Sequence, residues 1–249
     1  MCEECPSMCH ITKYQAYWLH NEPVEKLEFL DTTLDKRLNG VEGQDFHIKC
    51  IAKGGQPPPF LSIKIRNQVV EQGNQSVELT IKPIPRDFDN ASVECIANDS
   101  DLNISLSTKA YIYLSLKPLA PVFDRDPVIL KETEQLEISC TSTGSRPAAL
   151  FNWFMGGKNI TSYSTQKFTY ESTTDMYTTI SVLRYTVVKQ NNGQLITCRA
   201  SNEADPIGIS ASQTIQNQIE GKSWASPDTQ NLDSDYRWRV ILYSLSKEY

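Results

Sequence analysis

Four widely spaced cysteines constrain the fold of this chain more than any other feature. They form two successive pairs with separations of 45 and 58 residues, at positions Cys50, Cys95, Cys140 and Cys198. Apolar and polar residues alternate through 46–50 and 136–140, which indicates half-buried β-strands ending at the first cysteine of each pair. The alternation returns at 93–97 and 196–200, around the second cysteines. We therefore expect one structural unit to be used twice.

Each unit contains further apolar alternations, at 61–65 and 151–155, bounded by turn residues. Both cysteines of a pair have the inward parity of their strand, so they are expected to face each other across two packed sheets. Trp153 shares that inward parity in the second unit, and Ile63 holds the corresponding place in the first. Neither unit shows a helical period of useful length, which predicts an all-β chain.

Composition agrees with folded domains and argues against several functions. Hydrophobic residues make up 39% and charged residues 22% of the 249 residues, enough for a packed core. The 24 basic and 30 acidic residues give a net charge of -6, which argues against nucleic-acid binding. No apolar run approaches the roughly 18 residues needed to span a bilayer. The first ten residues do not resemble a secretory signal, so neither a signal peptide nor a transmembrane segment is visible in this chain.

The second unit resembles an immunoglobulin-superfamily domain. Cys140, Trp153 and Cys198 match the pattern in which an inward tryptophan packs on an inter-sheet disulfide. The turn 191–193 and the segment 198–202 are similar to the constant-like domains of nectin-like and nephrin-like adhesion molecules and of co-stimulatory ligands. The resemblance implies an immunoglobulin sandwich and a role in cell-surface recognition.

The first unit resembles the same superfamily with two departures. Ile63 stands where the core tryptophan is expected, which implies a smaller, aliphatic core. Both units depart from the tyrosine-corner pattern, because Val93 in the first and Ile196 in the second stand where that tyrosine is expected, two residues before the second cysteine. The spacing in the first unit is also short for a variable-type domain with two extra strands.

We therefore expect two tandem immunoglobulin-like β-sandwiches with irregular N- and C-terminal tails. The prolines at 118 and 121 predict a stiff connection between them. The expected boundaries are a disordered tail at 1–23, a first domain at 24–115, a linker at 116–119, a second domain at 120–217 and a disordered tail at 218–249.

The resemblance implies two disulfides, Cys50–Cys95 and Cys140–Cys198. Closing loops of this length should stabilise each domain by about 4 kcal/mol in the chain-entropy model. The alternative is two pairs of reduced, buried cysteines, because free cysteine also packs well in cores.

Five N-x-S/T sequons predict N-glycosylation if the chain enters the secretory pathway. All fall in predicted turns or at outward strand positions, and they are Asn74, Asn90, Asn98, Asn103 and Asn159. Asn98 and Asn103 are expected in the loop that joins the last two strands of the first domain, near the turn 57–59. Glycans there would shield the tip of this domain and leave a sheet face for a partner. Chance occurrence of sequons in Ser/Thr-rich strands is the alternative.

The two ends carry motifs with less specific readings. Cys2, Cys5, Cys9 and His10 could form a zinc knuckle, but they lack a second ligand pair, so we expect no metal site. The tail from residue 218 contains Trp, Tyr and Arg residues that could form an interaction segment, although disorder is the favoured interpretation.

The residues favour a binding protein over an enzyme. The three histidines form no evident constellation with a nucleophile, and no phosphate-binding loop or hydrolase motif is present. We expect no cofactor and no nucleic acid. We expect a protein partner, such as another immunoglobulin-type molecule, bound homophilically or heterophilically at a cell surface. The alternatives are a soluble immune-recognition protein that binds a microbial or glycan ligand and an intracellular structural spacer with reduced cysteines. The sequence identifies neither the partner nor the binding face.

Overall fold

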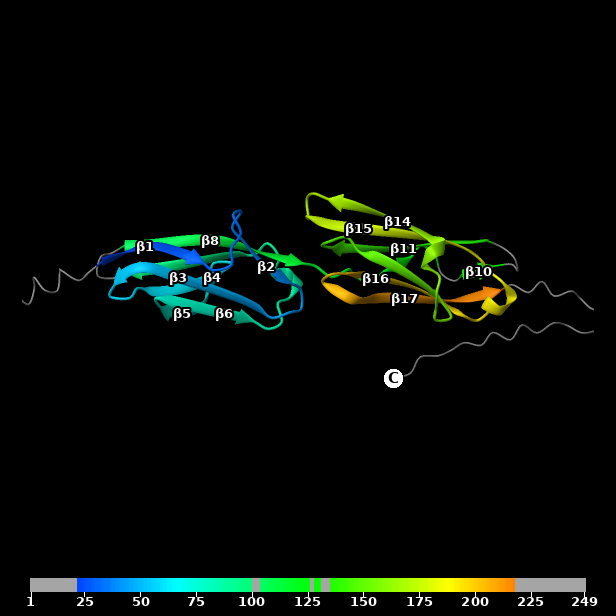
Figure 1. Cartoon of the computed structure of the whole chain (residues 1–249), viewed down its shortest axis with the longest axis horizontal. Coiled ribbons are helices and arrows are strands. Elements are labelled where there is room, and N and C mark those ends of the chain that lie inside the picture. The colour runs from blue at the N-terminus through cyan, green and yellow to red at the C-terminus, as the bar shows by residue number, and fades with distance from the viewer. Residues whose placement is uncertain (1–21, 100–103, 126–127, 131–134, 218–249) are drawn as a thin grey trace, which may run out of the picture. The chain divides into compact units, whose positions relative to one another are not determined.

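The computed structural model describes residues 22–99, 104–125, 128–130 and 135–217. These residues form two β-sandwiches in tandem, as the sequence predicted (Figure 1). All described strands belong to one compact unit of the chain. Within the described residues, three single-turn 3-10 helices connect strands, η1 at Arg86–Phe88, η2 at Thr161–Tyr163 and η3 at Lys189–Asn191.

The first sandwich pairs a three-stranded sheet with a five-stranded sheet. The smaller sheet has the order β1 (Glu22–Phe29), β3 (Phe46–Gln56), β6 (Ser76–Ile81). The larger sheet has the order β2 (Arg37–Val41), β8 (Ile104–Ser115), β7 (Ser92–Asp99), β4 (Phe60–Ile65), β5 (Gln68–Asn74). Along the chain, β5 and β6 are the only strands between β4 and β7, which are neighbours in this sheet. This short connection agrees with the spacing of 45 residues between Cys50 and Cys95.

The second sandwich pairs a four-stranded sheet with a five-stranded sheet. The four-stranded sheet has the order β14 (Ser164–Glu171), β15 (Met176–Thr186), β11 (Gln135–Ser145), β9 (Val122–Phe123). The five-stranded sheet has the order β10 (Val128–Leu130), β17 (Asp205–Asn217), β16 (Leu195–Asn202), β12 (Leu150–Met155), β13 (Lys158–Asn159).

A disulfide crosses the centre of each sandwich. The Cα–Cα distances are 6.5 Å for Cys50–Cys95 and 6.6 Å for Cys140–Cys198, and all four residues are fully buried. The two pairs therefore occupy equivalent places in cores that are otherwise made of aliphatic and aromatic side chains.

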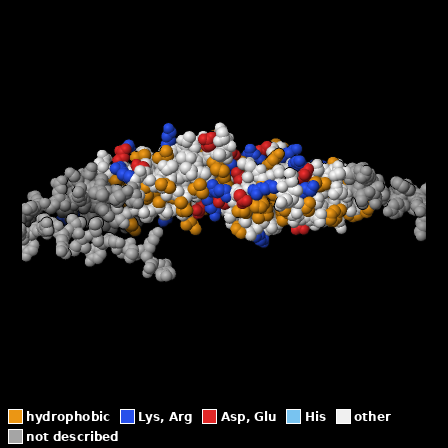
Figure 2. All heavy atoms as spheres, turned by 180° about the vertical axis from the view of Figure 1, so that it is seen from behind, with side chains coloured by type: hydrophobic (Ala, Val, Ile, Leu, Met, Phe, Trp, Pro, Cys, Tyr) orange, Lys and Arg blue, Asp and Glu red, His pale blue; other side chains and the backbone are white. Residues whose placement is uncertain are grey.

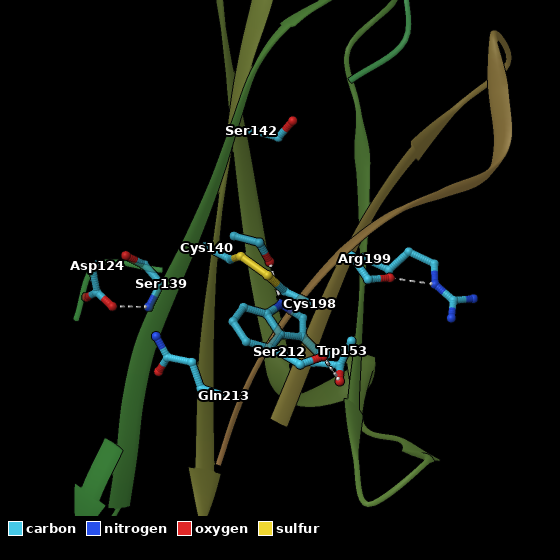
Figure 3. Close-up of a disulfide and its surroundings, with 12 residues drawn as sticks. Asp124, Ser139, Cys140, Ser142, Trp153, Cys198, Arg199, Ser212 and Gln213 are labelled. Atoms are coloured by element: carbon cyan, nitrogen blue, oxygen red, sulfur yellow. Dashed lines mark hydrogen bonds between the residues drawn. A yellow bond between two sulfur atoms is a disulfide. The ribbon is translucent and has the colours of Figure 1, made fainter. Parts of the chain in front are cut away.

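Trp153 and Ile63 occupy the same register position in their sandwiches. Trp153 lies opposite Cys198 on neighbouring strands, and Ile63 lies opposite Cys95. Trp153 lies against the disulfide and donates a hydrogen bond of 2.9 Å from Nε1 to Oγ of Ser181 (Figure 3). Since both side chains are fully buried, isoleucine substitutes for tryptophan at a structurally equivalent site.

Polar side chains fasten the corners where a tyrosine is missing. In the first sandwich Asp89 Oδ1 accepts a hydrogen bond of 2.9 Å from the amide of Leu114. In the second, Asn191 Oδ1 accepts one of 3.0 Å from the amide of Val188. The first bond ties the turn after η1 to strand β8, whereas the second joins the last residue of η3 to Val188, the residue that precedes η3.

The strand ends differ slightly from the expected boundaries. Strand β1 begins at Glu22, so the expected tail boundary at residue 23 is two residues too late. Strand β8 ends at Ser115, and the next residue, Leu116, is fully buried in the core of the first sandwich although we expected it in the linker. The expected tails, apart from residues 22 and 23, lie outside the described residues, as do Cys2, Cys5, Cys9 and His10.

Candidate interaction face and domain junction

The outer face of the five-stranded sheet in the first sandwich is open to solvent. Alternate residues of β7 are buried, so Glu94 and Ile96 point outward. Lys109 on β8 lies opposite Glu94 and forms an ion pair with it at 3.5 Å. Tyr111, two positions further along β8, is 50% exposed on the same face. This face thus offers an exposed aromatic ring beside polar and charged groups.

Two sequon asparagines flank a single aromatic residue on this face. Phe60 on β4 lies directly opposite Asn74 on β5 and Asn98 on β7. Directly opposite residues in antiparallel strands share a face, so the three side chains stand in one row beside the turn 57–59. Phe60 is 45% exposed. Glycans attached to both asparagines would cover it.

The expectation that Asn98 lies in a loop is wrong. Strand β7 continues to Asp99, and Asn98 pairs with Ser105 of β8. The Asn98 side-chain oxygen accepts a hydrogen bond of 3.2 Å from the Ser105 hydroxyl. A glycan on Asn98 would therefore stand on the sheet face itself and not only at the tip of the domain.

The remaining sequons lie elsewhere. Asn90 is exposed in the turn between η1 and β7, and Asn159 is exposed on β13. The Asn159 side-chain oxygen accepts a hydrogen bond of 2.9 Å from the amide of Thr161, the third residue of its sequon. Asn103 lies outside the described residues. Glycosylation at all five sites stays a prediction.

Charges on the described surface are mixed in sign. Figure 2 shows Lys and Arg side chains interspersed with Asp and Glu between hydrophobic side chains, without a large area of one sign on the face drawn.

No group of His, Cys, Asp and Glu among the described residues could hold a metal ion. His47 is exposed, and its Nδ1 lies 3.0 Å from Oγ1 of Thr80. None of the helices in the described part of the chain is long and apolar enough to cross a membrane.

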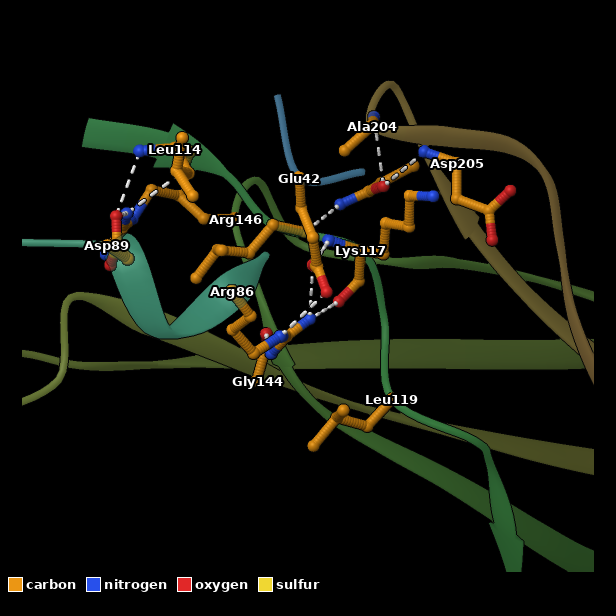
Figure 4. A network of polar contacts seen from close by, with 12 residues as sticks. Glu42, Arg86, Asp89, Leu114, Lys117, Leu119, Gly144, Arg146, Ala204 and Asp205 are labelled. Carbon is orange, nitrogen blue, oxygen red and sulfur yellow. Dashed lines mark hydrogen bonds and ion pairs between the residues drawn. The ribbon is translucent and has the colours of Figure 1, made fainter. Parts of the chain in front are cut away.

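A polar network joins the two sandwiches at the linker (Figure 4). Arg86, in η1 of the first sandwich, donates from Nε and Nη2 to the Glu42 carboxylate at 3.2 and 2.8 Å. Its Nη1 donates to the carbonyl of Gly144 in the second sandwich at 2.6 Å, and its Nη2 also contacts the carbonyl of Lys117. The amide of Lys117 in turn donates to Glu42 at 2.9 Å. One arginine therefore links both domains and the linker.

Arg146 forms the second and more deeply buried half of this network. Its side chain is 7% exposed, and Nη1 donates at 2.9 Å to Asp89 Oδ1, whose side chain is 5% exposed. Nη1 also donates to the carbonyl of Leu114 at 2.9 Å, and Nε donates to the carbonyl of Asp175 at 2.7 Å. Because Arg146 and Asp89 come from different sandwiches, a nearly buried ion pair spans the junction.

An aromatic ring and a second carboxylate complete the surroundings of Arg146. The guanidinium lies 4.3 Å from the ring centroid of Tyr113, and Arg37 lies 4.2 Å from the same ring. Burial raises the pKa of Asp175, but hydrogen bonds from Tyr170 and Tyr113 and nearby arginines outweigh it and lower the pKa below its usual value. Asp175 is thereby kept ionised beside Arg146.

The linker is held by the second sandwich through hydrogen bonds. The backbones of Leu116 and Arg146 exchange hydrogen bonds of 2.7 and 3.1 Å. Asn202 Nδ2 donates to the carbonyls of Leu116 and Pro147 at 2.8 and 3.0 Å. Leu119 donates its amide to Thr143 at 3.1 Å. The connection is stiff because of these bonds as well as its prolines.

The sequence did not predict this junction, because its carboxylates are scattered along the chain without a motif. One sequence feature could have pointed to it: Arg86 follows Pro85 and Arg146 precedes Pro147, so both arginines lie at turns. Charged residues at turns are common, and only the docking of the two domains shows which carboxylate each arginine meets.

Comparisons with known proteins support the sequence-based resemblance. Residues 124–206 match the family model of the CD80-like C2-set immunoglobulin domain. Human nephrin is 24% identical over 193 residues, which cover 71% of this chain and 15% of that protein. Mouse cell adhesion molecule 1 is 34% identical over 73 residues, 29% of this chain and 15% of that protein. The chain thus spans about one seventh of the length of these relatives.

Solved structures show the same two-domain fold. The crystal structure of Rst D1–D2 superposes with a TM-score of 0.52 at 21% identity, covering 80% of this chain and all of that one. The ectodomain of mouse nectin-like molecule 4 gives a TM-score of 0.51 at 16% identity, covering 74% of this chain and 67% of that one. These likenesses concern the fold.

Proposed function

Because the chain is an immunoglobulin-superfamily protein with two tandem domains, similar to adhesion molecules, we propose that it is a non-enzymatic recognition protein of the cell surface. It binds a protein partner through the outer face of sheet β2–β8–β7–β4–β5. The observation that carries this assignment is the exposed Tyr111 beside the Glu94–Lys109 pair on an open sheet face. Tyrosine is enriched among the residues that contribute most to protein interfaces.

The junction supports this function by fixing the distal domain. Binding loses free energy when flexible parts become ordered, so a rigid connection lowers the cost of association. The Arg86 and Arg146 contacts hold the first sandwich on the second, so the face is presented in one orientation. We therefore regard the junction as a positioning element and the sheet face as the contact surface.

A bead assay tests the proposal. The full chain, secreted from eukaryotic cells behind a heterologous signal peptide, is coupled to beads and mixed with beads that carry itself or other immunoglobulin-type ectodomains. We expect Tyr111→Ala to weaken the binding found by at least about tenfold, as for interface hot spots. Leu34→Ala is the matched control, because Leu34 is fully exposed in a turn outside the sheet. Absence of binding to every ectodomain, or equal binding by both variants, would contradict the proposal.

Glycans should leave part of this face accessible. Asn74 and Asn98 flank Phe60, whereas Tyr111 lies opposite Ser92 at the other end of β7. Replacing both asparagines with glutamine should remove two glycans by intact mass and leave partner binding unchanged or stronger. A loss of binding in a correctly folded double variant would show that the partner contacts the glycans or the Phe60 end.

A further inference from the structure

Strand β14 is an open edge of the second sandwich. It lies at the rim of sheet β14–β15–β11–β9, as Figure 1 shows, and pairs with β15 alone. The pairing runs without a break over all eight residues, from Ser164 opposite Leu183 to Glu171 opposite Met176. The far side of such a strand presents backbone donors and acceptors that another strand can satisfy.

Two other edge strands of the described sheets, β1 and β5, are interrupted. Strand β1 has the same length, but its pairing shifts between Val24 and Lys26. The register between β5 and β4 shifts between Ile63 and Lys64, and β5 ends at the sequon residue Asn74. Bulges of this kind discourage pairing between molecules. Strand β14 contains no bulge, glycine, proline or sequon.

Exposed aromatic rings stand along β14 in fixed positions. Phe168 is 59% and Tyr170 50% exposed. Their ring centroids lie 6.1 and 5.2 Å from that of Tyr177 on β15. The Tyr170 hydroxyl donates a hydrogen bond of 2.7 Å to Asp175 Oδ1. The rings are therefore held for contact before any partner arrives, which lowers the entropy lost on binding.

We propose that β14 pairs antiparallel with β14 of a second copy of this chain, about a two-fold axis at Thr169. The segment Lys167-Phe168-Thr169-Tyr170-Glu171 is complementary to itself in this register. Lys167 of each copy then lies opposite Glu171 of the other, and Phe168 lies opposite Tyr170. Opposite charges and aromatic pairs directly across two strands are both favourable, and a symmetric dimer uses the same patch twice.

The charges select this register. A lysine on an edge strand commonly opposes pairing with other chains. Centred on Lys167, the two-fold axis would place the two lysines face to face, whereas at Thr169 it places each lysine against a glutamate. Lys167 and Glu171 are both exposed, and neither has an ion pair within the described residues. Glu171 Oε1 accepts a hydrogen bond of 2.8 Å from the Thr173 hydroxyl.

The contact should be weak. In this register the two strands overlap only over residues 167–171, and five residues from each copy with four aromatic rings bury less than the roughly 1,200 Å² typical of stable complexes. It therefore acts when many copies are displayed together, because linked contacts gain avidity. This surface is separate from the sheet face of the first domain, so the two proposals can fail independently.

Charge reversal provides the test. The full chain, secreted from eukaryotic cells, is studied by sedimentation equilibrium up to about 1 mM, alone and in mixtures. Lys167→Glu and Glu171→Lys should each weaken self-association at least tenfold, since each brings like charges together. An equimolar mixture of the two variants should associate as well as the wild type, because every opposed pair is then oppositely charged. Lys189→Glu is the matched control, because it makes the same charge reversal at an exposed residue of η3, outside β14. It should leave self-association unchanged.

The outcomes separate cleanly. Loss in both single variants with recovery in the mixture supports the register. A wild-type chain that stays monomeric at 1 mM overturns the proposal, as does equal association of the wild type and both variants. Loss without recovery in the mixture, in variants with unchanged circular dichroism and disulfides, also overturns it, because the two charges then do not meet.

Discussion

Replacing Trp153 with alanine should destabilise the second domain by about 3–5 kcal/mol, the range found for large aromatic residues removed from cores. The indole is fully buried and lies opposite Cys198 at the centre of the sandwich. Its ring packs edge-on against Phe123, with centroids 6.0 Å apart, and its Nε1 donates to Ser181. Alanine would leave a cavity between the disulfide and these two neighbours.

Calorimetry on the full chain measures this effect. A loss of 1 kcal/mol lowers the melting temperature of a domain of about 100 residues by roughly 4–8 °C, so the shift should be large. Ile63→Ala is the matched variant in the first domain, where removal of an aliphatic side chain should cost about 2–5 kcal/mol. Trp153→Phe retains a ring but loses the bond to Ser181, so it should cost less than Trp153→Ala.

A cost below about 1 kcal/mol for Trp153→Ala would contradict a closely packed core, because it would require the cavity to collapse without strain. Equal losses for Trp153→Phe and Trp153→Ala would instead assign the effect to the hydrogen bond. The three variants thus separate packing from hydrogen bonding at one position.

The inward half of each sandwich could be predicted because the β-strand period is two. Once Cys50 and Cys140 are placed inward, parity assigns Ile63 and Trp153 to the core, and the structure buries both completely. Strand ends are harder to predict. Asn98 has a polar side chain next to a predicted loop, yet β7 continues through it because its backbone pairs with Ser105. Side-chain polarity carries no information about that pairing.

Contacts between domains could not be predicted for a different reason. Arg146 and Asp89 are 57 residues apart and lie on different sandwiches. Their contact depends on the docking of two surfaces, and hydrophobic periodicity describes only the interior of each sandwich.

The exposed aromatic residues of β14 were also not predicted from the sequence. Phe168 and Tyr170 share the parity of the core face, but β14 lies at the rim of its sheet and leaves them exposed.

Replacing Arg146 with methionine should destabilise the chain by about 3–5 kcal/mol, the cost of breaking a buried ion pair from one side. Methionine fills much of the arginine volume, so the loss comes mainly from polar groups left without a partner. Asp89 would keep its negative charge at 5% exposure, with the amide of Leu114 and the side-chain amide of Asn90, at 3.3 Å, as its remaining donors. The carbonyls of Leu114 and Asp175 would each lose a donor as well.

A second change isolates the charge. In Arg146→Met with Asp89→Asn, the asparagine oxygen still accepts the Leu114 amide but carries no charge. We expect this double variant to recover at least about 2 kcal/mol of the loss, because removing both partners of a buried pair costs far less than removing one. Arg86→Met is the matched control at the same junction. Its ion pair with Glu42 is more exposed, at 26% and 19%, so the loss should be smaller.

NMR relaxation measures the rotational correlation time of each sandwich. A purely local defect at Arg146 would leave these times unchanged. In the wild type the two sandwiches should tumble with one rotational correlation time, because Arg146 bonds to both. In Arg146→Met they should tumble separately, even at temperatures where both remain folded. If the double variant is as unstable as Arg146→Met, the uncompensated charge of Asp89 is not the cause of the loss. If both variants still tumble as one body, then the Arg86 contacts and the linker hydrogen bonds suffice to fix the junction, and Arg146 contributes stability without setting the orientation of the domains.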